Sequence, residues 1–162
     1  MYRLIYIDTT RWTELYTLRR SQTCWSPAAA FVKPSTAEEV AQVLGIVSRT
    51  GSKFSIRSTG HNPNPGFNSI NEGGIVIDLG NLNSKTLGGD GILLAGAGNT
   101  WGDIYPWLED QKRSAMGGRE TAVGLSGFLL GGKCTGCDHT KQVLIRRRRS
   151  WAITKPLWYR SR

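Results

Sequence analysis

Cysteine is scarce in this sequence, with three in 162 residues, and these three do not form the spacing of a disulfide-stabilised scaffold. Long apolar runs are also missing, and none approaches the roughly 18 residues that a membrane-spanning helix needs. The opening residues lack a secretory signal, because Asp8 interrupts a short apolar stretch and no small-residue cleavage site follows. We therefore expect no membrane span, no export signal and, by default, a cytoplasmic location.

Acidic residues are scarce only in the last 30 positions. Residues 1–132 carry 12 Lys or Arg against 11 Asp or Glu, whereas residues 133–162 carry nine against Asp138 alone, and the whole chain has a formal charge of +9. A basic face spread over a folded domain would indicate phosphate-backbone binding, but a charge block at one terminus is typical of a solvated extension. We expect salt-sensitive nonspecific adhesion from this tail and no specific nucleic-acid binding.

Glycine is abundant, with 20 residues, so the chain must make tight turns or bring its backbone close to another group. Apolar residues spaced at i, i+3, i+4 and i+7 from Val40 predict a helix of about four turns that begins after Thr36 and ends at Gly51. A second helix is predicted after Thr100, and Pro106 should kink or shorten it. Strands are predicted at residues 31–32, 53–58, 74–79 and 92–97. This order predicts an α/β (α+β) fold without internal repeats.

The most informative stretch is a turn that leads from a strand end through glycine into histidine. Its residues are Arg57, Ser58, Thr59, Gly60 and His61. Short side chains and a glycine allow successive backbone N–H groups to point at one spot, which is how a protein binds a phosphate without using a side chain. The alternative is a polar turn whose histidine is solvated or hydrogen-bonded.

A second glycine cluster alternates glycine with small residues. Its candidate site residues are Gly117, Gly118, Thr121, Val123, Gly124, Ser126 and Gly127. The cluster is not a P-loop, because Lys133 follows the last glycine pair without the required spacer and without a following Ser or Thr. It is not a Rossmann fingerprint either, because no GxGxxG lies between a strand and a helix.

Taken in order, four stretches of the chain resemble the FAD-linked oxidases whose FAD-binding domain is of the p-cresol methylhydroxylase and vanillyl-alcohol oxidase type. The nearest branch is the berberine bridge enzyme-like one. The stretches are PSTAEEVAQVL, KFSIRSTGHNPNPGFNSINEGGIVIDLGNLN, LLAGAGNTWGDIYPWL and GGRETAVGLSGFLLGG. The resemblance implies an incomplete FAD-binding domain over residues 27–132, after an irregular lead-in over residues 1–26 and before a basic tail over residues 133–162 that we expect not to fold.

The resemblance also implies FAD as the cofactor and a role for each glycine-containing segment. Residues 57–61 match the loop whose amides hold the FAD pyrophosphate, and His61 matches the histidine bonded to the flavin 8α carbon. The alternative is a noncovalent His61. Glu120 stands where one branch has a second, cysteinyl attachment, so any covalent bond should be single. Residues 117–127 match the segment beneath the flavin, and the alternative there is a packing role alone.

The reaction implied by the resemblance is oxidation of a small organic substrate by hydride transfer to the flavin, with dioxygen as the electron acceptor. In the family, the substrate domain and the catalytic base lie beyond the glycine-rich run, so no catalytic residue is identified in this chain. We therefore expect residues 1–162 alone to show no oxidase turnover and at most weak, noncovalent FAD binding, because loss of a proton acceptor alone costs about 10²–10⁴-fold in rate. The sequence makes no prediction of oligomeric state.

The composition changes abruptly at Lys133, which predicts an altered reading frame, a retained intron or a truncated gene. Cys134, Cys137 and His139 supply part of a zinc ligand set, but a structural zinc needs four ligands, so we expect no metal site. Two further functional alternatives follow from the tail and the missing substrate domain. In the first alternative, the chain is a noncatalytic truncated remnant of such an enzyme. In the second, it is a basic interaction module that works through residues 133–162.

Overall fold

The computed structural model describes residues 22–131, 145–147 and 150–152. The chain divides into two compact units, residues 1–82 and residues 83–162. Most of the predicted lead-in and most of the predicted basic tail, with the three potential zinc ligands, lie outside the described residues.

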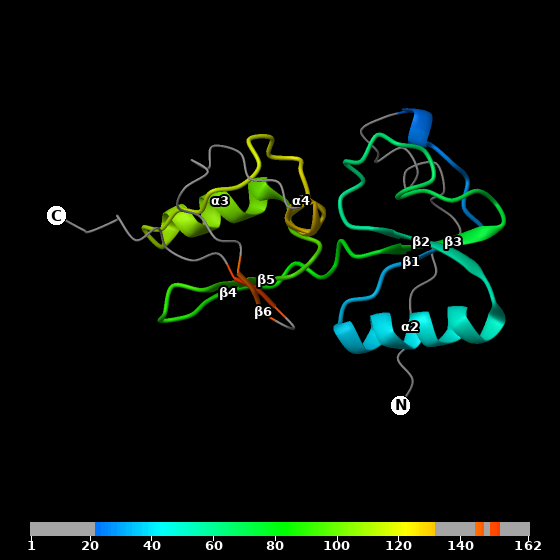
Figure 1. Cartoon of the computed structure of the whole chain (residues 1–162), viewed down its shortest axis with the longest axis horizontal. Coiled ribbons are helices and arrows are strands. Elements are labelled where there is room, and N and C mark those ends of the chain that lie inside the picture. Colours follow the sequence, from blue (N-terminus) through cyan, green and yellow to red (C-terminus); the bar gives the residue numbers. More distant parts are fainter. Residues whose placement is uncertain (1–21, 132–144, 148–149, 153–162) are drawn as a thin grey trace. The chain divides into compact units, whose positions relative to one another are not determined.

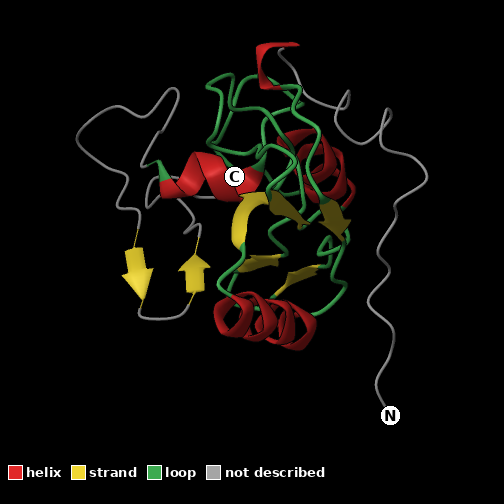
Figure 2. Cartoon of the chain, turned by 90° about the vertical axis from the view of Figure 1, so that its right-hand side faces the viewer, coloured by secondary structure: helices red, strands yellow, loops and turns green. Residues whose placement is uncertain are grey.

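A three-stranded parallel sheet is the centre of the first unit (Figure 1). Its strands are β1 (Ala30–Val32), β2 (Lys53–Arg57) and β3 (Gly74–Asp78), in the spatial order β1-β3-β2. The central strand β3 contains three consecutive β-branched residues and is buried along most of its length, as expected for a strand that is covered on both faces. Helix α2 (Ala37–Thr50) forms a separate layer below the strands in Figure 2. Its Val43 and Val47 pack against Val32 and Ile77 of the sheet.

The predicted first helix is confirmed, with both of its ends set by local sequence. The Thr36 side chain accepts a hydrogen bond from the N–H of Glu39 at 3.1 Å, which satisfies one of the donors that a helix start leaves unpaired. Gly51 ends the helix in the left-handed conformation, with φ of 64°, and its N–H donates to the Val47 carbonyl. The three predicted strands of this unit are confirmed as well.

Strand β2 buries two polar side chains and exposes its two apolar side chains. Ser55 and Arg57 are 7% and 3% exposed, whereas Phe54 and Ile56 are 43% and 46% exposed. The polar face is buried because it is hydrogen-bonded: the Ser55 hydroxyl donates to the Phe67 carbonyl at 3.4 Å, and Arg57 pairs with Asp78 of β3. The alternation of the sequence predicts the strand, but these contacts decide which face is covered.

The second unit contains a hairpin and two helices around one apolar cluster. The hairpin consists of β4 (Lys85–Leu87) and β5 (Leu93–Ala95), and the helices are α3 (Trp101–Asp110) and α4 (Leu125–Leu130). The buried cluster is formed by Leu93, Trp101, Ile104, Leu108, Leu125 and Leu129. Strand β5 confirms the strand predicted at residues 92–97. The sequence did not predict β4 or the short helix α4.

Helix α3 begins as predicted and continues through its proline. Thr100 and Asp103 form a complete capping box, in which each side chain accepts the other residue's backbone N–H. Pro106 does not end the helix, which runs on to Asp110. The buried residues Ile104 and Leu108 lie on either side of the proline in sequence, so packing of the apolar stripe holds the helix across this point.

Within the predicted basic tail, the structure describes β6 (Ile145–Arg147) and β7 (Ser150–Ala152), whose backbones pair antiparallel. That the rest of the tail does not fold stays a prediction. In the described part of the chain, no helix has the length and apolar character to cross a membrane. The same residues contain no cluster of three or more His, Cys, Asp or Glu that could hold a metal ion.

Candidate functional site

The turn that follows β2 requires a glycine. Gly60 is buried and has φ of 72°, a left-handed conformation that side chains with a Cβ rarely adopt. The neighbouring Ser58, Thr59 and His61 are half-buried. The strand end, the left-handed glycine and the histidine therefore form the compact turn that the sequence predicts.

Two backbone donors in this turn are available to a ligand. Among the described residues, the N–H groups of Thr59 and Gly60 donate to no hydrogen-bond acceptor. A backbone N–H without a protein partner needs water or a ligand as its acceptor, because leaving it unpaired in a buried place costs free energy comparable to a lost hydrogen bond. Adjacent donors of this kind suit an anionic oxygen, so the turn fits a phosphate group.

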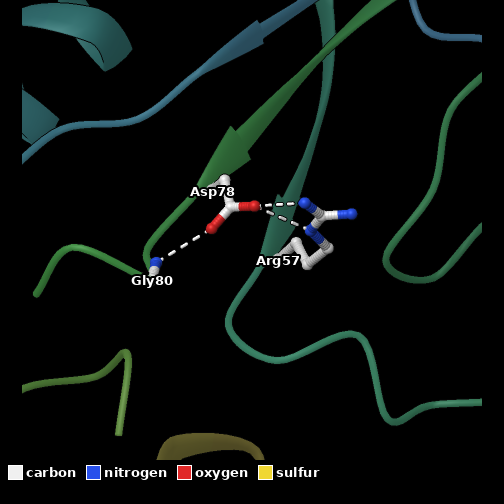
Figure 3. A network of polar contacts seen from close by, with 3 residues as sticks. All are labelled: Arg57, Asp78 and Gly80. Atoms are coloured by element: carbon white, nitrogen blue, oxygen red, sulfur yellow. Dashed lines mark hydrogen bonds and ion pairs between the residues drawn. The ribbon is translucent and has the colours of Figure 1, made fainter. Parts of the chain in front are cut away.

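The Arg57 side chain is engaged within the protein. Its Nε donates to Oδ2 of Asp78 at 2.9 Å and its Nη2 contacts the same oxygen, while the other carboxylate oxygen accepts the Gly80 N–H at 2.9 Å (Figure 3). The guanidinium carbon also lies 5.4 Å from the centroid of the Phe31 ring. Arg57 therefore joins the ends of β2 and β3 directly before the turn. A cofactor contact by its backbone stays a prediction.

The loop after His61 is held by its own polar groups and by one distant cysteine. The Asn68 side chain donates to the Asn62 carbonyl at 3.1 Å, and the Cys24 thiol donates to the Pro63 carbonyl at 2.9 Å. Sequence reasoning missed both donors. Cys24 is 39 residues from its acceptor, and no local pattern signals that contact.

The glycine pair Gly117 and Gly118 packs against a tryptophan. A Cβ at Gly117 would overlap the six-membered ring of Trp101, and a Cβ at Gly118 would lie 2.6 Å from Cδ1 of the same indole. The hydroxyl of Tyr105 donates to the Gly118 carbonyl at 2.6 Å, and its ring stacks on Trp101 with centroids 5.4 Å apart. Packing against Trp101 is therefore sufficient to explain both glycines. This agrees with the alternative interpretation, in which the glycine-rich segment has a packing role alone. Contact of their backbone with a cofactor stays a prediction.

The middle of the glycine-rich run covers the start of α3. The carbonyls of Thr121 and Val123 accept the N–H groups of Gly102 at 2.9 Å and Trp101 at 3.0 Å. Because these donors and that of Asp103 are satisfied by the protein, the N-terminus of α3 is not available to an anion.

The remaining three predicted residues lie at the start of α4. Gly124 forms an isolated bridge with Thr100, and the Ser126 hydroxyl donates to the Ala97 carbonyl at 3.0 Å. Gly127 differs from the glycine pair, because no described atom outside its neighbourhood in the helix lies within 4 Å of the position of an added Cβ. Packing within the described chain does not explain a glycine at this position.

Two ionisable groups of the second unit have shifted pKa values. Hydrogen bonds from the side chain and the backbone N–H of Thr100 lower the pKa of Asp103, which keeps the capping carboxylate charged at neutral pH. Burial raises the pKa of Tyr105. Its hydroxyl therefore stays protonated at neutral pH and remains the donor to the Gly118 carbonyl.

The structure brings the predicted site residues together in two groups. Residues 57–61 form one turn of the first unit, and residues 117–127 form one continuous segment along α3 and α4 of the second unit.

We expect Gly60→Ala to lower the free energy of unfolding by about 1–2 kcal/mol, because a Cβ in the left-handed conformation costs about that much. Chemical denaturation of the two chains measures the difference. Gly73→Ala is the matched control in the same unit, because Gly73 is exposed and has no left-handed φ. Equal stability of the Gly60→Ala and Gly73→Ala chains would contradict the strain at the turn.

Comparison with known proteins identifies the chain's relatives. Residues 28–147 match the family described as the FAD binding domain. The FAD-dependent monooxygenase macF of Penicillium terrestre is 44% identical over 112 residues, which are 68% of this chain and 22% of that protein. The FAD-dependent monooxygenase yanF of Aspergillus niger is 42% identical over 113 residues, or 69% of this chain and 20% of that protein. The chain thus spans about a fifth of the length of these relatives.

Solved structures share the fold. Aclacinomycin oxidoreductase matches with a TM-score of 0.69 at 22% identity, over 82% of this chain and 27% of that one. Chitooligosaccharide oxidase matches with a TM-score of 0.61 at 26% identity, over 76% and 27% of the two chains. A BBE-like protein from Arabidopsis thaliana matches with a TM-score of 0.61 at 23% identity, over 74% and 27%. The chain therefore belongs to the FAD binding domain family and has the fold of the berberine bridge enzyme-like and other FAD-linked oxidases.

Proposed function

We propose that this chain is the FAD-binding part of an oxidoreductase that acts on a small organic substrate. The observation that carries the proposal is the turn at residues 58–61, where a left-handed glycine presents two unpaired backbone donors next to a histidine. Membership of the FAD binding domain family supports the same cofactor, since a dinucleotide carries the phosphate oxygens that such donors bind.

In this proposal, the residues in and beside the turn have defined roles. The N–H groups of Thr59 and Gly60 bind a pyrophosphate oxygen, and the Arg57–Asp78 pair fixes the strand ends from which the turn projects. His61 is the residue that holds the flavin covalently. Bound FAD would supply two-electron oxidation of the substrate, with dioxygen as the electron acceptor. The substrate and the proton acceptor belong to the whole enzyme and are not assigned to residues here.

A titration of the 162-residue chain with FAD tests the proposal through quenching of flavin fluorescence. We expect saturable binding that is weaker than in a complete enzyme. Gly60→Ala should weaken it, because the left-handed turn sets the direction of the two donors. Gly73→Ala should leave it unchanged. Absence of any saturable binding, or equal binding by both variants, would contradict the role of the turn.

We expect Gly127→Ala to separate packing from cofactor contact. In the chain without FAD, this substitution should raise the free energy of unfolding by up to about 1 kcal/mol, because alanine is favoured over glycine within a helix and the added methyl meets no described atom. FAD affinity should fall about tenfold, the cost of overpacking one methyl group against the cofactor. Unchanged affinity would show that Gly127 does not contact FAD.

We expect His61→Ala to remove covalent attachment of flavin without abolishing binding. The measurement is flavin absorbance that stays with acid-precipitated protein, taken from the whole enzyme that contains this segment. Retention of covalent flavin in the His61→Ala enzyme would contradict the assignment. Glu120→Ala is the control, because a carboxylate cannot form the thioether of a second attachment and its removal should leave the covalent flavin in place.

A further inference from the structure

The backbone after His61 is fixed from two directions. Asn68, which is 6% exposed, donates from its side chain to the Asn62 carbonyl at 3.1 Å. Cys24, which is 1% exposed, donates from its thiol to the Pro63 carbonyl at 2.9 Å, and its sulfur lies 3.6 Å from the Asn62 carbonyl oxygen. Two buried side chains therefore bind the two peptide carbonyls that follow His61 in the chain.

These contacts restrict the histidine because peptide groups are planar and rigid. Holding the carbonyls of Asn62 and Pro63 fixes the Asn62–Pro63 and Pro63–Asn64 peptide planes, which begin one residue beyond His61. On the N-terminal side, the left-handed Gly60 fixes the direction in which the chain enters the residue. The loop also closes on itself, because the Asn62 side chain accepts the Asn64 N–H at 3.0 Å. The backbone is thus restrained on both sides of His61.

Cys24 lies before residue 28, where the match to the FAD binding domain family begins. The segment that matches the family therefore does not include Cys24. Its exposure of 1% means that solvent does not compete for the thiol, so the sulfur–carbonyl contact persists although a thiol is a weak donor.

We propose that Cys24 and Asn68 are positioning residues for His61: by holding the Asn62 and Pro63 carbonyls, they fix the backbone from which the imidazole projects at the FAD-binding turn. The FAD-related part of this inference rests on the proposed function. The structural part, which concerns the His61 imidazole, does not.

The test compares four variants of the 162-residue chain without FAD. Cys24→Ala and Asn68→Leu each remove one donor, whereas Cys24→Ser retains a donor that can reach a carbonyl. Val47→Ala is the control for general destabilisation, because Val47 is buried between α2 and the sheet and is not among the residues that bind the loop. The measured quantities are the NMR signals of the His61 imidazole, assigned by their loss in His61→Ala, and the hydrogen exchange of the backbone amides of residues 62, 64 and 66–69.

We expect Cys24→Ala and Asn68→Leu to shift or broaden the His61 signals and to speed amide exchange in the loop about fivefold, which corresponds to the net loss of one hydrogen bond. Cys24→Ser should restore the signals, and Val47→Ala should leave them in place. Unchanged His61 signals in both donor-deleting variants would overturn the proposal, as would equal changes in Val47→Ala.

A parallel FAD titration of the same chains separates this inference from the proposed function. We expect the two donor-deleting variants to bind FAD about fivefold more weakly than the unsubstituted chain, and Cys24→Ser to bind it normally. If the unsubstituted chain binds no FAD, the proposed function fails, while the imidazole signals still decide whether Cys24 and Asn68 position His61. If FAD binds equally to all chains, the positioning has no effect on the cofactor, and that part of the proposal is wrong.

Discussion

Gly117→Ala is expected to destabilise the second unit by about 3 kcal/mol, at the upper end of the cost of overpacking a core. The reason is geometric: the new Cβ would lie 2.2 Å from two ring carbons of Trp101, which is fully buried among Ile104, Leu125 and other members of the apolar cluster. Neither the ring nor the glycine segment can move without disturbing this cluster. Thermal or urea unfolding of the chain measures the loss.

Gly89→Ala is the matched control for this substitution. Gly89 belongs to the same unit and has no left-handed φ. Within the part of the chain that the structure describes, no atom other than those of Gly89 and its two chain neighbours lies within 4 Å of the position of an added Cβ. We expect it to change stability by less than about 0.5 kcal/mol, as surface substitutions usually do. If Gly117→Ala and Gly89→Ala unfolded at the same denaturant concentration, packing against Trp101 would not be the reason for the glycine.

Asp78→Asn should cost about 3–5 kcal/mol, the range measured when one partner of a buried ion pair is removed. The asparagine amide keeps an oxygen for the Gly80 N–H, but it removes the negative charge that Asp78 places against the buried Arg57 guanidinium. The free energy of unfolding from urea denaturation gives the magnitude. Glu72→Gln neutralises an exposed carboxylate of the same unit and should have almost no effect.

A double substitution distinguishes an uncompensated charge from a simple loss of contact. Arg57→Met combined with Asp78→Leu replaces the pair by apolar side chains of similar length, and such replacements are often neutral or stabilising. We expect the double variant to be more stable than Asp78→Asn alone. A double variant at least as unstable as the single one would contradict the uncompensated charge as the main cost of Asp78→Asn.

The first unit was largely predictable because its signals are local. Thr36 and Gly51 define the ends of α2 within its own sequence, and the β-branched run of β3 identifies a buried strand. The turn at Gly60 was predicted for the same reason, since a glycine between short polar residues is readable without knowing its surroundings.

The features that sequence reasoning missed depend on contacts between distant residues. The polar face of β2 is buried because Arg57 meets Asp78, 21 positions later. The loop after His61 is held by Cys24, which is 39 positions from its acceptor Pro63. Contact of the glycines near residue 117 with a cofactor stays a prediction, whereas the packing of Trp101 against Gly117 and Gly118 was not predicted. A glycine in a sequence indicates that another group lies close to the backbone, and the fold identifies that group.

The fit of Gly117 and Gly118 around Trp101 has a consequence for the evolution of this family. Because one indole occupies the volume of two missing side chains, the three positions should covary among homologous sequences. A lineage that replaces the tryptophan by a smaller residue becomes free to accept alanine or serine at either glycine, whereas a lineage that retains it should keep both. Reading these positions together therefore separates glycines that persist for the cofactor, such as the proposed Gly127, from glycines that persist for an aromatic neighbour.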